Sequence, residues 1–151
     1  MNTATPTSAI PSAQPPLAIR DMTSADYAAV MSLWNSASGV RASETPEELA
    51  RILARNPGLS CVATTADELA AAVLCGHDGR RGYLYHLAVA AHFQRQGLAQ
   101  RLVDRCLAGL QAEGIARCTI FLIADNEAGE RFWRQTGWRE RTELKAFARD
   151  L

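Results

Sequence analysis

The chain lacks a surplus of charge of either sign. Its 151 residues contain 16 Lys and Arg against 16 Asp and Glu, which gives a formal net charge of +0 at pH 7. Proteins held to nucleic acids or anionic membranes by electrostatic attraction carry a basic surplus. The chain also lacks an apolar run of the roughly 20 residues that cross a bilayer. We therefore expect neither a nucleic acid nor a membrane as its partner.

Signals for export and for metal binding are scarce as well. Residues 1–16 contain no Lys or Arg and are interrupted by proline, unlike a secretory signal peptide. The cysteines form no C-x-x-C pair and accompany no His cluster at zinc spacing. They are Cys61, Cys75, Cys106 and Cys118. We therefore expect a cytoplasmic protein with buried free thiols and no bound metal.

Composition divides the chain into two parts. Residues 1–16 consist mostly of Ser, Thr, Ala and Pro. Such a segment cannot bury enough apolar surface to offset the entropy lost on ordering. The sequence therefore predicts a disordered tail at 1–16, followed by a single domain over 17–151, a length at which one hydrophobic core is usual.

Hydrophobic periodicity predicts a mixed α+β domain, a sheet flanked by about four helices with one parallel crossover. Thr45 is expected to cap a helix that has Pro46 at its first position. The longest helix is expected over 97–113, with Gly114 after it. Other helices are expected to begin at Thr23 and Asn126, and strands to cover 17–20, 59–65, 69–75, 83–89, 119–123 and one or two stretches of 138–147.

The strand expected at 83–89 alternates in character. Regular pleating would place Tyr83, Tyr85, Leu87 and Val89 on one face, and Leu84, His86 and Ala88 on the other. His86 would then lie on the face opposite to Tyr85. A lone histidine on a strand is either a packed residue or a catalytic base, and the pattern leaves both interpretations open.

A strand, a short loop and a glycine at the start of the longest helix follow one another at 87–100. This arrangement leaves backbone N–H groups unpaired at the positive end of the helix, which suits a phosphate or pyrophosphate. Gly97 would allow close approach, and the side chains of Arg95 and Gln100 could add contacts. The alternative interpretation is an ordinary helix start.

Two motifs carry a resemblance to a known family. Residues 94–99, QRQGLA, resemble the pyrophosphate-binding motif Q/R-x-x-G-x-G/A of the GCN5-related N-acetyltransferases (GNAT). A second motif of that family, an Asn, an aromatic pair and a Gly-aromatic, is matched by Asn126, Phe132, Trp133, Gly137 and Trp138. The resemblance covers residues 17–147, and GHDGRRGYLYHLAV looks most like small bacterial acetyltransferases of undefined substrate.

The resemblance implies a mostly antiparallel sheet with a splayed parallel strand pair, and acetyl-CoA as co-substrate. A primary amine of a small molecule, an amino acid or a protein N-terminus would attack the thioester directly, without a covalent enzyme intermediate. It implies these cofactor-binding residues: Leu87, Ala88, Val89, Arg95, Gln96, Gly97, Leu98, Ala99, Gln100, Asn126 and Trp133. A homodimer is left open.

Two departures from the family keep an alternative in view. Many members carry Tyr where Trp133 stands, and an indole cannot protonate the departing thiolate, so Trp133 is expected to pack against the cofactor. No strand carboxylate occupies the usual place of a base, where Tyr83 and Tyr85 stand as catalytic candidates or as pocket walls. The alternative is a non-catalytic acyl-CoA-binding sensor or partner domain. A Rossmann-type nucleotide-binding domain fits poorly, because the sequence has no G-x-G-x-x-G.

The loop between the first two helices often forms the acceptor wall in this family. It offers Trp34, Arg41 and Glu44 as candidate substrate-binding residues. Glu44 would hold an ammonium group and Arg41 a carboxylate, unless the loop is simply solvated.

Overall fold

The computed structural model describes residues 16–151, so the tail predicted at 1–16 lies outside the described residues except for Pro16. The strands are β1 (Ala18–Asp21), β2 (Cys61–Thr64), β3 (Leu69–His77), β4 (Gly82–Val89) and β5 (Cys118–Ile120). The helices are α1 (Tyr27–Ser36), α2 (Pro46–Arg55), α3 (Leu98–Ala112) and α4 (Glu127–Gln135), with 3-10 turns η1 (Ser24–Asp26) and η2 (Ala91–Phe93).

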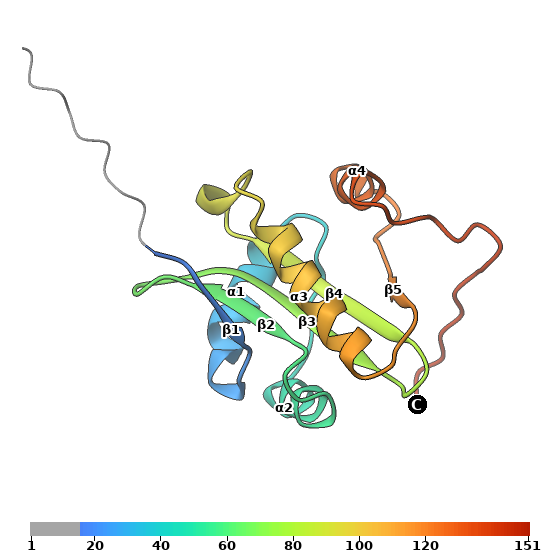
Figure 1. Cartoon of the computed structure of the whole chain (residues 1–151), viewed down its shortest axis with the longest axis horizontal. Coiled ribbons are helices and arrows are strands. Elements are labelled where there is room, and N and C mark those ends of the chain that lie inside the picture. Colours follow the sequence, from blue (N-terminus) through green and yellow to red (C-terminus); the bar gives the residue numbers. More distant parts are fainter. Residues whose placement is uncertain (1–15) are drawn as a thin grey trace, which may run out of the picture.

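The five strands form one mixed sheet in the order β1-β2-β3-β4-β5 (Figure 1). The first four pair antiparallel, and β4 and β5 pair parallel through the crossover that contains α3. This is the predicted mixed architecture. A parallel pair needs such a crossover because its two strands run in the same direction.

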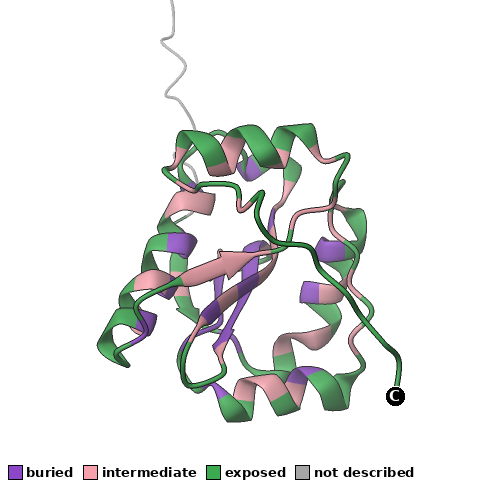
Figure 2. Cartoon of the chain, turned by 90° about the vertical axis from the view of Figure 1, so that its right-hand side faces the viewer, coloured by how far each residue is buried: buried purple, intermediate pink, exposed green. Residues whose placement is uncertain are grey.

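Helices cover both faces of the sheet. On one face, α3 buries Leu102, Val103 and Cys106 against β2 and β3. On the other face, Val30 and Trp34 of α1 pack with Leu49 of α2, and these side chains are completely buried. Figure 2 shows the buried strands between helices whose outer surfaces are exposed. The sheet therefore separates two hydrophobic clusters and holds α1 and α3 on opposite sides of β4.

Four free cysteines contribute to this interior. Cys61, Cys75 and Cys106 are fully buried in the cluster beneath α3. The Sγ atoms of Cys61 and Cys106 lie 3.9 Å apart, so they are in contact and not bonded. Cys118 in β5 is half-buried, and burial raises the pKa of its thiol to about 12.

Local sequence determines where two helices begin and end. Thr45 caps α2 as predicted: its Oγ1 accepts from the Glu48 N–H at 3.2 Å while Glu48 accepts from the Thr45 N–H at 2.8 Å. At the end of α3, Gly114 has a φ of 78° and its N–H donates to Gln111. This left-handed position terminates the helix and returns the chain toward β5.

The alternation predicted for β4 is wrong, because the strand contains a bulge. Ala72 pairs with Ala88 but Leu74 pairs with Tyr85, so β4 has one more residue than β3 over this stretch. His86 takes up the difference with a left-handed φ of 56°. After His86, the residues that regular pleating would place on one face of the sheet lie on the other.

The exchange can be followed in the two clusters. Leu84 before the bulge and Leu87 and Val89 after it all pack on the α3 side, whereas Tyr85 and Ala88 pack on the α1 side. Regular pleating would have placed Leu87 and Val89 with Tyr85. The bulge therefore faces both Tyr85 and Ala88 toward the α1–α2 loop.

The strands expected within 138–147 are also wrong. The described chain has no strand after α4, and residues 139–151 run on as an almost wholly exposed coil beyond β5 (Figures 1 and 2). The reason is composition: charges of both signs alternate from Arg139 to Glu143, where Arg141 pairs with Glu143, and Leu144 and Phe147 are exposed. The strand expected at 119–123 is shorter as well, ending at Ile120.

Candidate active site

A cleft of about 1230 Å³ opens beside β4. It exists because β4 and β5 stay paired for only three residues each, from Gly82 opposite Cys118 to Leu84 opposite Ile120. From Tyr85 onward the β5 side of β4 has no strand partner in the described chain. The cleft is walled by the start of α3 and the loop before it, by 120–123 with α4, and by residues 36–41, which are the last residue of α1 and the loop after it.

One end of the cleft is lined by unpaired backbone N–H groups. Within residues 16–151, the six successive N–H groups of 95–100 donate no hydrogen bond, and the first helical bond of α3 runs from the Arg101 N–H to the Gly97 carbonyl at 3.2 Å. Arg95 and Gly97 have left-handed φ values of 62° and 74°, which curl this stretch into a concave turn. With the positive end of a 15-residue helix behind it, the turn is suited to an anion such as a pyrophosphate.

Gly97 leaves this turn accessible. A β-carbon built on it meets nothing within 4 Å, so the space above the backbone is open toward the cleft that Gly97 lines. A non-glycine residue at φ 62°, as at Arg95, is strained. The strain sits within a turn whose N–H groups are unpaired. A bound anion would offset it by accepting hydrogen bonds from those groups.

The open side of β4 offers backbone groups along the cleft. The Ala90 N–H donates to Ala70 in β3, and alternation along an antiparallel pair therefore directs the Val89 carbonyl away from β3. That carbonyl accepts from the side-chain amide of Gln94 at 3.1 Å. Gln94 thus occupies, from the chain's own loop, the position where an extended ligand with amide groups would pair with β4.

The far wall of the cleft is built by α4 and the aromatic residues on it. Asn126 caps the helix, its Oδ1 accepting from the Gly129 N–H at 2.9 Å, and its side chain contacts Gly39 of the opposite wall. Trp133 lines the cleft with Phe132, packs on the α3-side cluster, and meets Trp138 edge-on at a ring-centroid distance of 4.9 Å. Trp133 is therefore an apolar wall of the cleft.

A histidine–carboxylate pair lies where β4 passes the α1–α2 loop. The Nε2 of His86 is 2.6 Å from Oε1 of Glu44, with the two side chains 16% and 26% exposed. The Ser43 N–H donates to the other carboxylate oxygen, and the Tyr27 hydroxyl fixes the loop by donating to the Glu44 carbonyl at 2.8 Å. Because a carboxylate only accepts, the bond places a proton on Nε2, and in the neutral form of the ring Nδ1 is then an acceptor. His86 itself lines the cleft.

The ring of Trp34 packs against the ring of His86. It is fully buried, its ring centroid lies 5.1 Å from that of His86, and its Nε1 has no hydrogen-bond partner within the described residues. Trp34 was predicted to contact substrate; the structure places it under His86 and outside the cleft lining. Glu44 also lies outside the lining and reaches the cleft only through His86.

The two candidate tyrosines of β4 differ in position. Tyr85 lines the cleft and Tyr83 does not, being stacked between Tyr85 and Phe121 at centroid distances of 6.2 Å. Burial, followed by the neighbouring Tyr83, raises the pKa of Tyr85. Its phenol therefore keeps its proton at neutral pH and is suited to donating a hydrogen bond and not to accepting a proton.

The structure brings most of the predicted cofactor residues to the cleft. Its lining includes Leu87, Ala88, Val89, Arg95, Gly97, Leu98, Ala99, Gln100, Asn126 and Trp133, together with Arg41 of the predicted acceptor loop. Gln96 lies outside it, with its side chain donating to the His92 carbonyl at 3.4 Å. The Gln100 amide nitrogen donates to Asp104 at 2.6 Å, while its Oε1 is buried without a partner in residues 16–151.

Sequence reasoning missed the pairing of His86 with Glu44. The two residues are 42 positions apart, and nothing in the pattern of β4 announces the bulge that turns the histidine. Within residues 16–151 no three His, Cys, Asp or Glu side chains are arranged to hold a metal. In the same part of the chain, no helix is both long and apolar enough to span a membrane.

The sheet splays beside a turn of free N–H groups, and comparison with known proteins assigns the family. The sequence profile of the Acetyltransferase (GNAT) family matches residues 27–138. An acetyltransferase of Pectobacterium atrosepticum is 34% identical over 104 residues, covering 68% of this chain and 74% of that protein. One of Sodalis glossinidius is 32% identical over 104 residues, covering 68% and 73%. The chain belongs to the GNAT family and is an N-acetyltransferase.

Solved structures agree in fold. An aminoglycoside 6'-N-acetyltransferase of Acinetobacter haemolyticus superposes with a TM-score of 0.70 at 17% identity, covering 89% of this chain and 99% of that one. The ribosomal-protein-S18-alanine N-acetyltransferase of Escherichia coli gives a TM-score of 0.67 at 20% identity, covering 84% and 80%. The acceptors in these names, an aminoglycoside antibiotic and an alanine of a ribosomal protein, differ so widely that the fold alone leaves the acceptor of this chain open.

Proposed function

We propose that the protein transfers an acetyl group from acetyl-CoA to the primary amine of a small molecule, an amino acid or a protein N-terminus. The observation that carries this proposal is the run of unpaired N–H groups of 95–100, five of whose six residues line one end of the cleft, next to an unpaired strand edge. Acetyl-CoA has the matching parts: a pyrophosphate for the N–H groups, and an arm with two amides for the strand. A cytoplasmic setting is part of the proposal, and the four free cysteines suit a reducing compartment.

The residues divide the binding of the cofactor between them. The N–H groups of 95–100 would bind the pyrophosphate, with the side chain of Arg95 nearby. The backbone of Leu87, Ala88 and Val89 would pair with the pantetheine amides after the Gln94 side chain releases the Val89 carbonyl. Asn126 and Trp133 would line the opposite side of the arm. Acetyl-CoA supplies the activated thioester, and the chain supplies position and proton transfer.

Proton transfer is the part of the reaction that His86 fits. An amine is mostly ammonium at neutral pH and must lose a proton before its lone pair can attack. With Nε2 bonded to Glu44, the Nδ1 of His86 is available to take that proton, directly or through a water molecule. Glu44 would hold the ring in this tautomer and stabilise the charged imidazolium, while Tyr85 would donate a hydrogen bond to the departing thiolate.

A calorimetric titration with acetyl-CoA tests the proposed cofactor site. Gly97→Glu would place a carboxylate over the N–H groups and should abolish binding. Gly114→Glu is the matched control, because Gly114 has a similar φ of 78° and open space around it but lies at the other end of α3. Both variants carry the same backbone strain, so only loss of binding in Gly97→Glu with retention in Gly114→Glu supports the site.

The alternative, an acyl-CoA-binding protein without activity, predicts a different result in a second measurement. Release of free thiol from acetyl-CoA would stay at the uncatalysed rate with every amine tested, although acetyl-CoA binds. Amine-dependent thiol release by the intact protein excludes this alternative. Absence of acetyl-CoA binding by the intact protein would contradict both.

A further inference from the structure

The charged residues that line the cleft are all cationic. They are Arg41, Arg95 and Arg131, and no Asp or Glu belongs to the lining in the described part of the chain. The carboxylate of Glu44, which lies outside the lining, is bonded to His86 and to the Ser43 N–H. A cationic cleft attracts anions and repels polycations.

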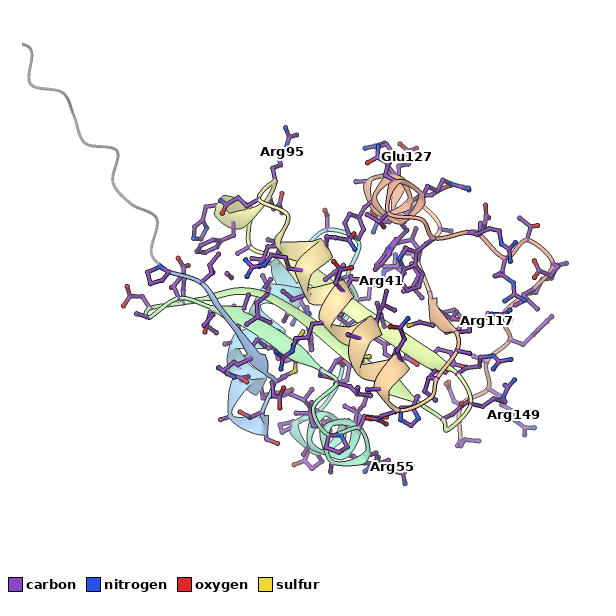
Figure 3. All side chains as sticks on the ribbon, viewed as in Figure 1. Arg41, Arg55, Arg95, Arg117, Glu127 and Arg149 are labelled. Atoms are coloured by element: carbon purple, nitrogen blue, oxygen red, sulfur yellow. The ribbon has the colours of Figure 1, made fainter. Side chains whose placement is uncertain are left out.

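Arg95 and Arg41 lie at different places. Figure 3 shows Arg95 projecting outward from the loop before α3, whereas Arg41, which also lines the cleft, appears well apart from it, nearer the middle of the view. Arg95 belongs to the turn of free N–H groups. Arg41 belongs to the segment that contacts Asn126 through Gly39 and reaches His86 through Glu44. Arg41 therefore lines the cleft from the same loop that supplies Glu44, the partner of the candidate base.

Arg41 forms no ion pair and donates no side-chain hydrogen bond within residues 16–151, and its side chain is exposed. Its guanidinium therefore keeps all its donors for a ligand. A guanidinium presents two parallel N–H groups that match the two oxygens of a carboxylate. The neighbouring wall residues Ser36, Ser38 and Val40 are uncharged and do not compete for it.

Resting on the proposed function, we propose that the acceptor is a small amino-carboxylate, with Arg41 binding its carboxylate and His86 receiving the proton of its amine. A small molecule that carries both groups offers one to Arg41 and one to His86, which both line the cleft. Polyamines and aminoglycosides lack the carboxylate and would add positive charge to a cleft that holds only cations. A protein N-terminus has its nearest free carboxylate at no fixed distance.

The test compares acceptors that differ only in the carboxylate. Thiol release from acetyl-CoA is measured with α-, β- and γ-amino acids, with the primary amide of each, and with spermidine. The expected result is at least one amino acid whose kcat/KM exceeds that of its amide by ten-fold or more. Preference for an amide or for spermidine, or no acceleration by any amino acid while acetyl-CoA binds, would overturn the proposal.

Charge variants of Arg41 test whether this residue determines the preference for an acceptor with a carboxylate. Arg41→Gln should raise KM for the amino acid about ten-fold with little change in kcat, and Arg41→Glu should favour the amide over the amino acid. Arg55→Gln is the control, since Arg55 is an exposed cation on α2 outside the cleft. The Kd of acetyl-CoA should be unchanged in Arg41→Gln. A weakened Kd with unchanged acceptor preference would assign Arg41 to a cofactor phosphate and overturn the proposal, whereas loss of acetyl-CoA binding by the intact protein would reject the proposed function itself.

Discussion

The side chain of Asn126 lies directly against the backbone of Gly39: a β-carbon on Gly39 would come within 2.2 Å of Asn126 Nδ2. Asn126 caps α4 and Gly39 belongs to the loop after α1, so this contact joins two opposite walls of the cleft. Only glycine permits it, because the position also has a left-handed φ of 79°. The width of the cleft therefore depends on a residue without a side chain.

Gly39→Ala should weaken acetyl-CoA binding by displacing Asn126. Gly79→Ala is the control, because Gly79 has a φ of 88° with open space around it. Each variant should lose about 1–2 kcal/mol of stability from backbone strain, and only Gly39→Ala should raise the Kd of acetyl-CoA, by about ten-fold, or 1.4 kcal/mol. Thermal unfolding and calorimetry separate the two effects. An unchanged Kd in Gly39→Ala would show that Asn126 does not contact the cofactor.

Removal of the candidate base should lower kcat and leave cofactor binding intact. General-base catalysis contributes about 10²–10⁴-fold, so His86→Gln should reduce kcat at least about 100-fold. Glu44→Gln keeps a hydrogen-bonding side chain and should reduce kcat less, by about ten-fold. His92→Gln is the matched control, since His92 forms a similar pair with Glu68 at 2.8 Å on the surface. Equal activity of the His86 and His92 variants would leave His86 a structural residue.

Tyr85 should ionise at a higher pH than an ordinary tyrosine. Burial raises its pKa, so the neutral phenol persists to a higher pH than an ordinary tyrosine, which ionises near pH 10. The ultraviolet titration of tyrosinate reports the three tyrosines of the chain together. Tyr85→Phe should remove a component that ionises later than an ordinary tyrosine, and Tyr83→Phe should retain it. If the component that ionises at high pH persists in Tyr85→Phe, it does not belong to Tyr85, and burial does not raise the pKa of this residue.

Ionisation of Asp26 should make the free energy of unfolding depend on pH in the acidic range. The bidentate hydrogen bonds from Arg20, at 2.8 Å each, are the main reason that the pKa of Asp26 is lowered, and the Thr23 N–H adds to them. A lowered pKa in the folded state means that the stabilisation is complete above about pH 4 and is lost as the pH falls through the folded value.

Asp26→Asn should therefore cost about 1 kcal/mol of unfolding free energy at pH 7, and progressively less as the pH falls below 4. Denaturant unfolding at pH 7 and at pH 2.5 measures the difference. Asp67→Asn, on the exposed β2–β3 turn, should change little at either pH. A deficit in Asp26→Asn that persists undiminished in acid would assign it to packing and not to charge.

What could be predicted from the sequence was local. The Thr45 cap, the extent of α3 and the turn before it depend on residues within a few positions of one another, and all three occur as expected. The β4 bulge could not be predicted, because a left-handed residue is not marked in the sequence when it is a histidine. The pairing of His86 with Glu44 follows from that bulge and from tertiary contact, which periodicity does not report.

The prediction of strands within 138–147 was wrong for a related reason, since it too depended on tertiary contacts. Trp138 and Phe147 suggested apolar strand faces, but a strand at the edge needs partners as well as propensity. Charges of both signs in 139–145 are satisfied in water and in local ion pairs, such as Arg134 with Glu140 at 2.6 Å. The segment therefore gains little by joining β5, which itself pairs over only three residues.

The sulfur atoms of Cys61, Cys75 and Cys106 lie between α3 and the sheet, where no reagent reaches them in the closed molecule. Hydrogen bonding to Cys61 and burial raise the pKa of Cys106, so its reactive thiolate is suppressed as well. The alkylation rate of these thiols therefore reports local opening of the structure. In native buffer this rate measures how often α3 separates from the sheet. A ligand that contacts both α3 and β4 should lower it, because the ligand stabilises the unopened state.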